Sequence, residues 1–399
     1  MKIVVESALY LVFVVVSVLL AYQVVLGIAA AYIKQKKNVV AQKYRKFAVV
    51  IPAHNEEKMI AKTIYSFMNI DYPQKLFDII VIADNCNDNT AQIASEFGAQ
   101  VLVRFDDTKK GKGYALRWGF DQIVTSDSQY DAVVVIDSDS LVSGNYLNVL
   151  NYYLEQGSRV IQSSDLVLPQ PDNWSIEATR IGFLLFNYIK PLGRKYLGFH
   201  AGLRGNGMCF STDVLRETPW QAWSLTEDVE YGLILILNGY QIDFAPEATV
   251  WAQMPVHSAN AESQRTRWEH GRYQITKQYA PKFLKLAITN RSLVYFDLFI
   301  DLITPPFVNL MLFVSMMMVL TFMLMLLSIT GSIHFGLWFL MLLLGIFYLF
   351  YGLRTAGADS TLYKSLLYIP RYIFWKIKVW LRSAITRREI NWIRTTRDN

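Results

Sequence analysis

Residues 131–140 read Asp-Ala-Val-Val-Val-Ile-Asp-Ser-Asp-Ser, in which five apolar residues are followed by two closely spaced acids. The five apolar residues, 132–136, are mostly β-branched and predict a strand that is buried on both faces, as in a parallel sheet. Asp137 and Asp139 follow at the carboxyl end of that strand, where open α/β sheets bind their ligands. Carboxylates this close repel each other, and a divalent cation that prefers oxygen, Mg²⁺ or Mn²⁺, would offset the repulsion. A solvated Asx-type turn is the alternative interpretation, and these ten residues alone do not separate the two.

Alternating strands and helices surround this stretch. The pattern predicts strands at 47–53, 77–83, 100–104, 132–136 and 159–163, and helices at 55–69, 88–97, 113–123 and 145–154. Such alternation builds a mostly parallel sheet with helices on both faces, which is a nucleotide-binding type of architecture. The predicted fold class is therefore α/β.

The composition indicates membrane segments beside this polar domain. Of 399 residues, 53% are hydrophobic and only 18% are charged, and the mean hydropathy is +0.22. The net charge of +6 is modest and does not call for a nucleic acid partner. Cys86 and Cys209 are the only cysteines, with no CxxC pair. We therefore expect neither a disulfide framework nor a zinc site, which fits a reduced, cytoplasmic domain.

Three apolar stretches are long enough to cross a bilayer. Residues 8–32 form the first, and its basic residues follow it rather than lead it, which favours a retained helix over a signal peptide. Residues 305–330 and 333–353 form the other two, with only Gly331-Ser332 between them, and predict a transmembrane hairpin. Basic residues after the first span and throughout the C-terminal tail place the domain and the C-terminus in the cytoplasm, so that the protein is a multi-pass membrane protein.

The resulting domain organisation has five parts. They are an N-terminal transmembrane helix (1–33), a cytoplasmic domain (47–285), an interfacial segment (286–304), the hairpin (305–353) and a basic cytoplasmic interfacial tail (354–399). Within the domain, residues 181–197 are aromatic and amphipathic. They fit either a core helix or a helix that lies in the membrane interface.

Polar residues at the other strand ends are candidates for ligand contact. Asp84 ends the second strand, where a carboxylate can accept a hydrogen bond from a nucleotide base, although Asp-Asn is also a common turn. Asn55 and Glu56 follow the first strand and read as ligand contacts or as a helix cap. Lys112 belongs to a basic, glycine-containing turn before a helix, which suits a diphosphate but also a solvated loop.

Two motifs lie further along the chain. Thr226-Glu227-Asp228 precedes an apolar helix and could be an ordinary helix start or could hold a general base. Gln264, Arg267 and Trp268 place a hydrogen bonder, a cation and a large aromatic side chain together. Arginine suits a diphosphate charge and tryptophan suits the apolar face of a sugar, whereas an exposed helix could carry the same residues without any ligand.

Together these motifs resemble the membrane-bound family 2 glycosyltransferases, which include cellulose, chitin and hyaluronan synthases and glucosylceramide synthase. Residues 49–56 look like the opening strand and nucleotide loop of that family, and residues 112–116 resemble its Lys-Ala-Gly-Asn/Ala-Leu loop. Residues 137–139 match its DxD motif, residues 226–228 its TED motif and residues 264–268 its QxxRW motif. The resemblance covers roughly residues 47–274.

The resemblance implies a GT-A, Rossmann-like domain and an inverting transfer. Asp228 would be the catalytic base, and Asp137 and Asp139 would hold Mg²⁺ or Mn²⁺. Glu227, Asn206 and Trp268 would contact the acceptor. The nucleotide sugar, a UDP-sugar in this interpretation, would contact Pro52, Ala53, Asn55, Glu56, Asp84, Lys112, Asp137, Ser138, Asp139, Gln264, Arg267 and Trp268.

Departures from the family pattern leave the acceptor open. Arg117 stands where polysaccharide synthases often have Asn, and residues 203–207 replace the usual acceptor stretch of cellulose synthases. We expect a synthase that extends an exopolysaccharide or capsule-type glycan. Three spans are few for a polymer channel, so this function would call for an oligomer or a partner subunit. The alternatives are transfer of one sugar to a membrane lipid and a non-catalytic membrane scaffold that binds nucleotide sugar.

Overall fold

The computed structural model describes residues 2–33, 39, 41–126, 129–254, 258–369, 371 and 373, with backbone alone for 258–263. The chain divides into two compact units. Of the described residues, the sheet unit comprises 39, 41–126, 129–176, 200–254 and 258–275, and the helical unit comprises 2–33, 177–199, 276–369, 371 and 373. The candidate motifs at residues 49–56, 112–116, 137–139, 226–228 and 264–268 all fall in the sheet unit.

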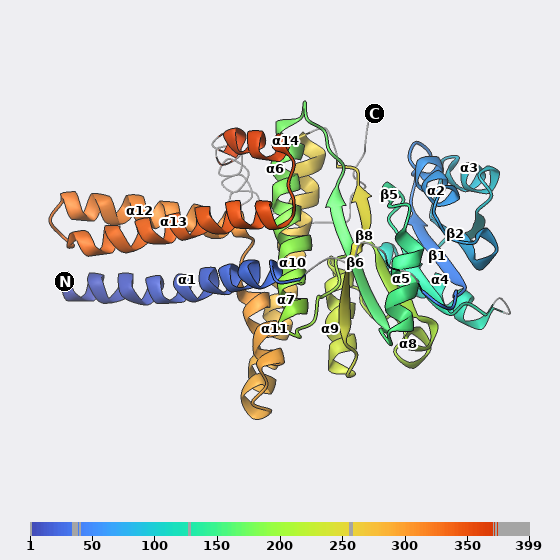
Figure 1. Ribbon diagram of the computed structural model, residues 1–399, viewed down its shortest axis with the longest axis horizontal. Helices are drawn as coiled ribbons and strands as arrows, with labels where there is room; N and C mark the ends of the chain where they lie inside the picture. The colour runs from blue at the N-terminus through green and yellow to red at the C-terminus, as the bar shows by residue number, and fades with distance from the viewer. Residues whose placement is uncertain are drawn as a thin grey trace. The chain divides into compact units, whose positions relative to one another are not determined.

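The sheet unit is built on one mixed sheet of eight strands (Figure 1). The strands are β1 (Phe47–Ala53), β2 (Phe77–Asp84), β3 (Gln100–Arg104), β4 (Ala132–Val135), β5 (Ser140–Val142), β6 (Val160–Val167), β7 (Met208–Ser211) and β8 (Ile242–Ala252). Their order is β3-β2-β1-β4-β7-β6-β8-β5. Strands β1 to β4 are parallel, β7 runs antiparallel between β4 and β6, β8 is parallel to β6, and β5 closes the edge antiparallel to β8.

Helices cover both faces of this sheet. They are α2 (Ile60–Met68), α3 (Thr90–Glu96), α4 (Lys112–Thr125), α5 (Tyr146–Glu155), α8 (Thr212–Glu217) and α9 (Glu227–Leu237), with a short 3-10 turn at Gln74–Leu76. Successive residues of β1 are buried on opposite faces of the sheet. Val49 packs in the core that α2 and α5 cover, and Val50 is buried but does not belong to that core. Helix α4 approaches β2 so closely that a Cβ on Gly119 would overlap Ile82. Burial on both faces explains why the strands read as continuous apolar runs.

The antiparallel strand β7 changes which loops meet at the edge of the sheet. Parallel strands bring their carboxyl ends to one edge, and an antiparallel strand brings its amino end there. In β7, Met208 pairs with Val135 of β4 and with Gln162 of β6. The loop that enters β7, residues 203–207, therefore lies beside the end of β4 and the two acids that follow it.

The predicted strands β1 to β4 and β6 are confirmed, and the antiparallel strands β5 and β7, together with β8, are a finding of the structure. The predicted helix at 55–69 begins later, at Ile60, because Asn55 adopts a left-handed backbone with φ of 58°, which a helix cannot contain, and a turn at residues 57–59 precedes the helix. Strand β6 extends to Val167, four residues beyond the predicted 163. The sequence did not predict β5, β7 or β8, since β5 and β7 are very short and β8 pairs irregularly beside Pro246.

The helical unit contains three helices that are long and apolar enough to span a membrane. They are α1 (Lys2–Ala30), α12 (Phe307–Leu326) and α13 (Ser332–Thr355), and α12 and α13 run side by side as a hairpin (Figure 1). Glycines allow close packing, since a Cβ on Gly27 would meet Tyr348 of α13 and one on Gly345 would meet Met311 of α12. Small residues at helix contacts are typical of membrane bundles. The three predicted spans are thus confirmed as candidates.

The remaining elements of the helical unit pack on these spans. Residues 181–197 form the end of α6 (Trp174–Phe183), the π-helical turn Leu184–Ile189 and α7 (Lys190–Tyr196). Their apolar side chains are largely buried, and α7 packs along α1, as the core-helix alternative expected. Helix α10 (Ser258–Thr289) enters the unit at Thr276, and α11 (Leu293–Ile303) follows it. Of the predicted basic tail, residues 354–369, 371 and 373 are described, including α14 (Ser360–Ser365) and the 3-10 turn Leu366–Tyr368, and the rest lies outside the described residues.

Buried ion pairs join α7 to α11 inside the helical unit. The Arg194 guanidinium, 1% exposed, contacts the carboxylates of Asp297 and Asp301, and the Tyr22 hydroxyl donates to Asp297 at 2.8 Å. Lys190 pairs with Asp301. Because every charge has an opposite partner, this polar cluster is compatible with an otherwise apolar unit.

The entry to β7 generates a stability prediction. Gly207 has φ of 73°, and a Cβ there would overlap the Ser163 hydroxyl and lie 3.0 Å from the Val250 side chain. We expect Gly207→Ala to destabilise the protein by about 2 kcal/mol and to lower the melting temperature of the purified full-length chain, because strain and overlap act together. Gly144→Ala is the control, since that position is open and has no left-handed backbone. Equal melting temperatures for the two variants would contradict this packing.

Candidate active site

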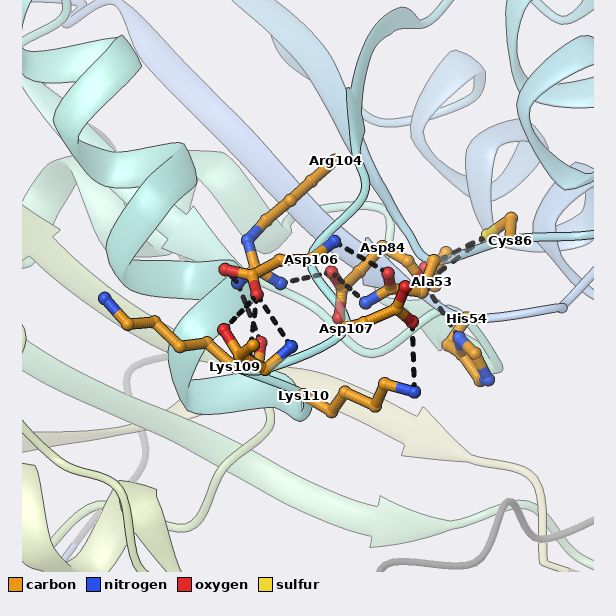
Figure 2. Close-up of polar contacts among 11 residues, drawn as sticks. Ala53, His54, Asp84, Cys86, Arg104, Asp106, Asp107, Lys109 and Lys110 are labelled. Carbon is orange, nitrogen blue, oxygen red and sulfur yellow. Dashed lines mark hydrogen bonds and ion pairs between the residues drawn. The ribbon is translucent and has the colours of Figure 1, made fainter.

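Asp84 lies at one end of the candidate site in a buried ion pair. Its side chain, at the end of β2, accepts from Arg104 Nη1 at 2.5 Å, and both side chains are less than 10% exposed. Arg104 also contacts Asp106 at 2.9 Å and donates to the Lys109 carbonyl at 2.7 Å, as Figure 2 shows. Burial raises the pKa of Asp84, although Arg104 opposes the shift. Asp84 is therefore held in one orientation and is linked to the basic turn that leads to Lys112.

The loop after β1 lies against the end of β2. Asn55 Oδ1 accepts from the Asn87 backbone at 2.8 Å, and the Glu56 backbone donates to the Thr90 hydroxyl at 2.7 Å. Helix α2 starts at Ile60 with Met59 as its N-cap, so neither Asn55 nor Glu56 caps it. These residues join two strand ends, as does His54, whose Nδ1 lies 2.7 Å from the Asp84 carbonyl (Figure 2). Pro52 and Ala53 are the last residues of β1 and adjoin this loop.

Lys112 lies at the centre of the candidate site. It is the first residue of α4, and its Nζ contacts Asp137 Oδ1 at 2.5 Å and donates to the Gly205 carbonyl at 2.7 Å. Burial alone would lower the pKa of Lys112, but the negative charges of Asp137, Glu227 and Asp228 hold it above its usual value. The lysine is thus a half-buried cation among acids and not part of a solvated loop.

A hydrogen-bonded network orients the Asp137-Ser138-Asp139 turn. Asn206, 3% exposed, accepts from the Asp137 backbone at 3.1 Å and donates to the Ser140 hydroxyl at 2.9 Å. That hydroxyl donates to Asp139 Oδ1 at 3.2 Å. Ser138 is buried, and its carbonyl accepts from the Thr63 hydroxyl at 2.8 Å. Both ends of the Asn206 amide are engaged inside the protein, so Asn206 positions the acids of this turn.

Asp165 is a further acid that the sequence did not reveal. It lies on β6, is 5% exposed, and accepts from Asn206 Nδ2 at 3.3 Å. Burial, followed by repulsion from Asp137, raises the pKa of Asp165 well above its usual value, and Asp139 adds to the shift. Its only sequence signal was a run of polar residues, Gln-Ser-Ser-Asp, within an otherwise apolar strand.

These acids fit a divalent cation that a substrate helps to hold. No cluster of three or more His, Cys, Asp or Glu side chains within the described ranges is arranged to hold a metal ion by itself. Mg²⁺ is commonly bound by one or two carboxylates together with substrate phosphates, which does not require a complete protein cage. Asp137 and Asp139 supply oxygen donors of that kind. Burial is the main cause of the raised pKa of Asp165, and repulsion from Asp137 and Asp139, which a cation would relieve, adds to it.

Glu227 and Asp228 begin α9 beside Lys112. A Cβ on Gly205 would lie 3.0 Å from Asp228 Oδ2, so the backbone that binds Lys112 also contacts this acid. Burial, followed by repulsion from Asp228, raises the pKa of Glu227 to about 7, and burial raises the pKa of Asp228. Thr226 is the N-cap residue, but its buried hydroxyl makes no hydrogen bond with the described residues. The motif is therefore not an ordinary side-chain cap.

Helix α10 brings the third motif next to α9. A Cβ on Gly271 would lie 2.6 Å from Thr226 Cγ2, so α10 passes directly over the start of α9. Arg267 and Trp268 precede Gly271 by about one turn and are half-buried, and Gln264 is buried. The structure thus unites most sequence candidates along one edge of the sheet and adds Arg104, Asp165 and Gly205. It does not define which ligand Gln264, Arg267 and Trp268 would contact.

A mixed sheet of this order, with acids and a lysine at its carboxyl edge, defines a nucleotide-binding α/β domain of the GT-A class. The chain belongs to the family described as glycosyltransferase like family 2, which it matches over residues 45–271. This confirms the resemblance drawn from the motifs.

Individual relatives agree with this assignment. The chain is 28% identical over 263 residues to the probable glycosyltransferase YdaM of Bacillus subtilis, covering 64% of this chain and 61% of that protein. It is 24% identical over 242 residues to the poly-beta-1,6-N-acetyl-D-glucosamine synthase of Staphylococcus epidermidis, covering 59% and 56%. It is 25% identical over 252 residues to the beta-monoglucosyldiacylglycerol synthase of Trichormus variabilis, covering 61% and 53%. The matches thus span between half and two thirds of each relative.

A solved structure supports the fold. The mannosyltransferase PcManGT from Pyrobaculum calidifontis, in complex with GDP-Man and Mn²⁺, superposes with a TM-score of 0.51. The superposition covers 88% of this chain and 99% of that chain at 12% sequence identity. At this identity the likeness concerns the fold alone, and it confirms the predicted GT-A class.

Proposed function

We propose that the protein is an inverting membrane glycosyltransferase that moves a sugar from a nucleotide sugar, a UDP-sugar, to a growing exopolysaccharide or capsule-type glycan. The observation that carries this proposal is the convergence of Lys112, Asp137, Glu227 and Asp228 at one edge of the sheet. A basic group for a diphosphate and an acid with a raised pKa are the components that such a transfer needs.

Each end of the site has a separate task in this proposal. Asp84, held by Arg104, accepts from the nucleotide base, and Pro52, Ala53, Asn55 and Glu56 shape the loop around it. Lys112 lies at the amino end of α4, where the helix dipole also favours a phosphate. Ser138 and Gln264 complete the nucleotide-sugar site, and Arg267 steadies the diphosphate as negative charge develops on it.

The chemical step is a direct displacement at the anomeric carbon. A hydroxyl oxygen of the acceptor forms a bond to that carbon while the bond from the carbon to the diphosphate oxygen breaks. Asp228 accepts the hydroxyl proton, and the bonding electrons leave with the nucleoside diphosphate. Glu227 and Trp268 contact the acceptor, and Asn206 supports this side of the site through its loop. The transition state resembles an oxocarbenium ion, as in other glycosyl transfers.

Asp137 and Asp139 would hold the Mg²⁺ or Mn²⁺ of the donor complex. When bound, the cation supplies positive charge that stabilises the diphosphate as a leaving group. Asn206 and Ser140 keep the two acids oriented for this purpose, and Asp165 accepts a hydrogen bond from Asn206. Lys112 provides a second positive charge at the same place.

The membrane arrangement follows from the three candidate spans. We propose that α1, α12 and α13 cross the membrane and that the basic residues after α1 and in the C-terminal tail keep the sheet unit and the C-terminus in the cytoplasm. Leu293 and Phe296 of α11 are 74% and 46% exposed, which suits an interfacial helix. A polymer product would still call for an oligomer or a partner subunit, because three spans enclose little space.

A lipid acceptor is the second candidate. It is favoured by the similarity to a beta-monoglucosyldiacylglycerol synthase, which is as great as the similarity to the polysaccharide synthase. The product made by purified protein from labelled UDP-sugars separates the two functions. A ladder of lengthening glycans supports the first, whereas one discrete glycolipid supports the second.

Asp228→Asn tests the catalytic base. We expect turnover to fall by about a thousandfold while the affinity for UDP changes less than threefold, because the amide keeps the shape but cannot accept the proton. Nucleotide release and isothermal titration with UDP measure the two quantities. Asp213→Asn, at an exposed position on α8, is the control. Normal turnover in Asp228→Asn would remove Asp228 from this role.

The raised pKa of Glu227 predicts a pH dependence. The base must be unprotonated, and the negative charge of Asp228 helps to raise the pKa of Glu227, so Asp228 loses its proton first and Glu227 ionises at a pH of about 7. We expect turnover to rise with pH as Asp228 deprotonates, and to change again as Glu227 ionises beside it. Glu227→Gln cannot titrate, so the pH profile of its nucleotide release should keep the acidic limb of Asp228 and lack the change near pH 7. A change near pH 7 that persists in Glu227→Gln would contradict this assignment.

Asp139→Ala tests the cation site. We expect Mn²⁺ to strengthen UDP binding in the unchanged protein by about tenfold or more and to have little effect in the variant, because one of two carboxylate ligands is lost. Calorimetric titrations of UDP with and without Mn²⁺ measure the difference. Asp243→Asn, outside the site, should retain the full Mn²⁺ effect. The same Mn²⁺ effect in Asp139→Ala would contradict the assignment.

A further inference from the structure

An exposed pair of aromatic side chains lies beside the candidate active site. Tyr114 of α4 and Trp223, in the loop between α8 and α9, stack with ring centroids 4.4 Å apart and an angle of 19° between their planes. Trp223 is 45% exposed, and Tyr114 is half-buried. We call Tyr114 and Trp223 the aromatic platform. None of the glycosyltransferase motifs includes Trp223.

The loop that carries Trp223 is fixed at several points. Glu230 of α9 accepts from the backbone of Trp223 and of Ser224, both at 3.0 Å. Arg117 of α4 donates to the Trp220 carbonyl at 3.3 Å, and the buried Trp220 indole donates to the Ala222 carbonyl at 3.2 Å. Arg117, the residue that departs from the family pattern, thus holds this loop. An aromatic side chain on an anchored loop loses little conformational entropy when it binds a ligand.

The aromatic platform is joined to the catalytic acids by packing. Tyr114 is two residues after Lys112, at the amino end of α4. A Cβ on the intervening Gly113 would lie 2.5 Å from the Ala222 carbonyl and 3.4 Å from Glu227 Cβ. The loop of Trp223 therefore crosses the start of α4 next to Glu227. The platform lies on the side of Lys112 where the acceptor would meet Glu227 and Asp228.

The surroundings of the aromatic platform favour a sugar over a lipid chain. An acyl chain needs a continuous apolar groove, whereas charged residues interrupt the surroundings of the platform: Arg117 and Glu230 anchor its loop, and Lys112 and Glu227 adjoin Gly113 at its base. A pyranose ring presents an apolar C–H face together with hydroxyl groups. Tryptophan and tyrosine rings match that face, and the charged side chains match the hydroxyls.

We propose that the aromatic platform is an acceptor subsite, in which Trp223 stacks on a pyranose ring of a saccharide acceptor. This inference rests on the proposed glycosyltransferase function and deepens it, because it selects a glycan acceptor over diacylglycerol. The anchored loop holds the sugar beside Glu227, so that a hydroxyl group of the acceptor chain reaches Asp228.

Binding measurements on the full-length protein in detergent test the proposal. The probes are β-linked tetrasaccharides of glucose and of N-acetylglucosamine, with UDP present, and 1,2-dioleoylglycerol in mixed micelles. We expect the unchanged protein to bind at least one tetrasaccharide. Trp223→Ala should raise the Kd for that tetrasaccharide by about tenfold, and the Kd of Trp223→Phe should stay within threefold of the unchanged protein. The Kd for UDP should change less than twofold in each variant. Tyr65→Ala, at a position on α2 that is 59% exposed, is the matched control, and its Kd values for the tetrasaccharide and for UDP should equal those of the unchanged protein.

Several outcomes would overturn the proposal. The first is that the unchanged protein binds no tetrasaccharide or transfers sugar to 1,2-dioleoylglycerol alone. The second is that Trp223→Ala and Tyr65→Ala bind the tetrasaccharide with equal affinity. The third is that Trp223→Ala loses affinity for UDP and for the saccharide to the same extent. Failure of the underlying function is a separate result, because the unchanged protein would then release no nucleotide from any UDP- or GDP-sugar. If the protein releases nucleotide but binds saccharide without Trp223, the acceptor subsite is refuted and the glycosyltransferase function is retained.

Discussion

The ion pair between Lys112 and Asp137 is the interaction on which the candidate site depends. Asp137, Asp139, Asp165, Glu227 and Asp228 converge on a small, partly desolvated region, where like charges repel strongly. The Lys112 ammonium offsets part of that repulsion and fastens α4 to the end of β4 and to the loop before β7. In the proposed function, this excess of negative charge attracts a cation, and the same lysine contacts the diphosphate.

Strand direction determines which residues surround that ion pair. The parallel strands deliver Asp84 and the Asp137-Ser138-Asp139 turn to one edge of the sheet. Because β7 is antiparallel, its entry loop reaches the same edge and places Asn206 between Asp137, Ser140 and Asp165. A parallel strand in that position would have carried this loop to the opposite edge. The mixed sheet is thus a requirement of the site.

The sequence predicted what depends on local pattern. Continuous apolar runs identified the parallel strands, and polar residues at their ends identified Asp84, Asp137 and Asp139. It did not predict β7, whose four residues carry no periodic signal, and therefore gave no structural reason for Asn206 to lie near the acids. Asp165, Arg104 and Trp223 were missed for a related reason. Their importance comes from partners that are distant in the chain, such as Asn206, Asp84 and Tyr114.

A structure of the full-length protein with UDP and Mn²⁺ bound would show whether the two acids and Lys112 form the donor site. We expect the uracil base to lie against Asp84, the diphosphate to lie at the amino end of α4 within reach of Lys112, and Mn²⁺ to contact Asp139. A nucleotide bound at another place, or a diphosphate that lies far from Lys112 and Asp139, would contradict this assignment.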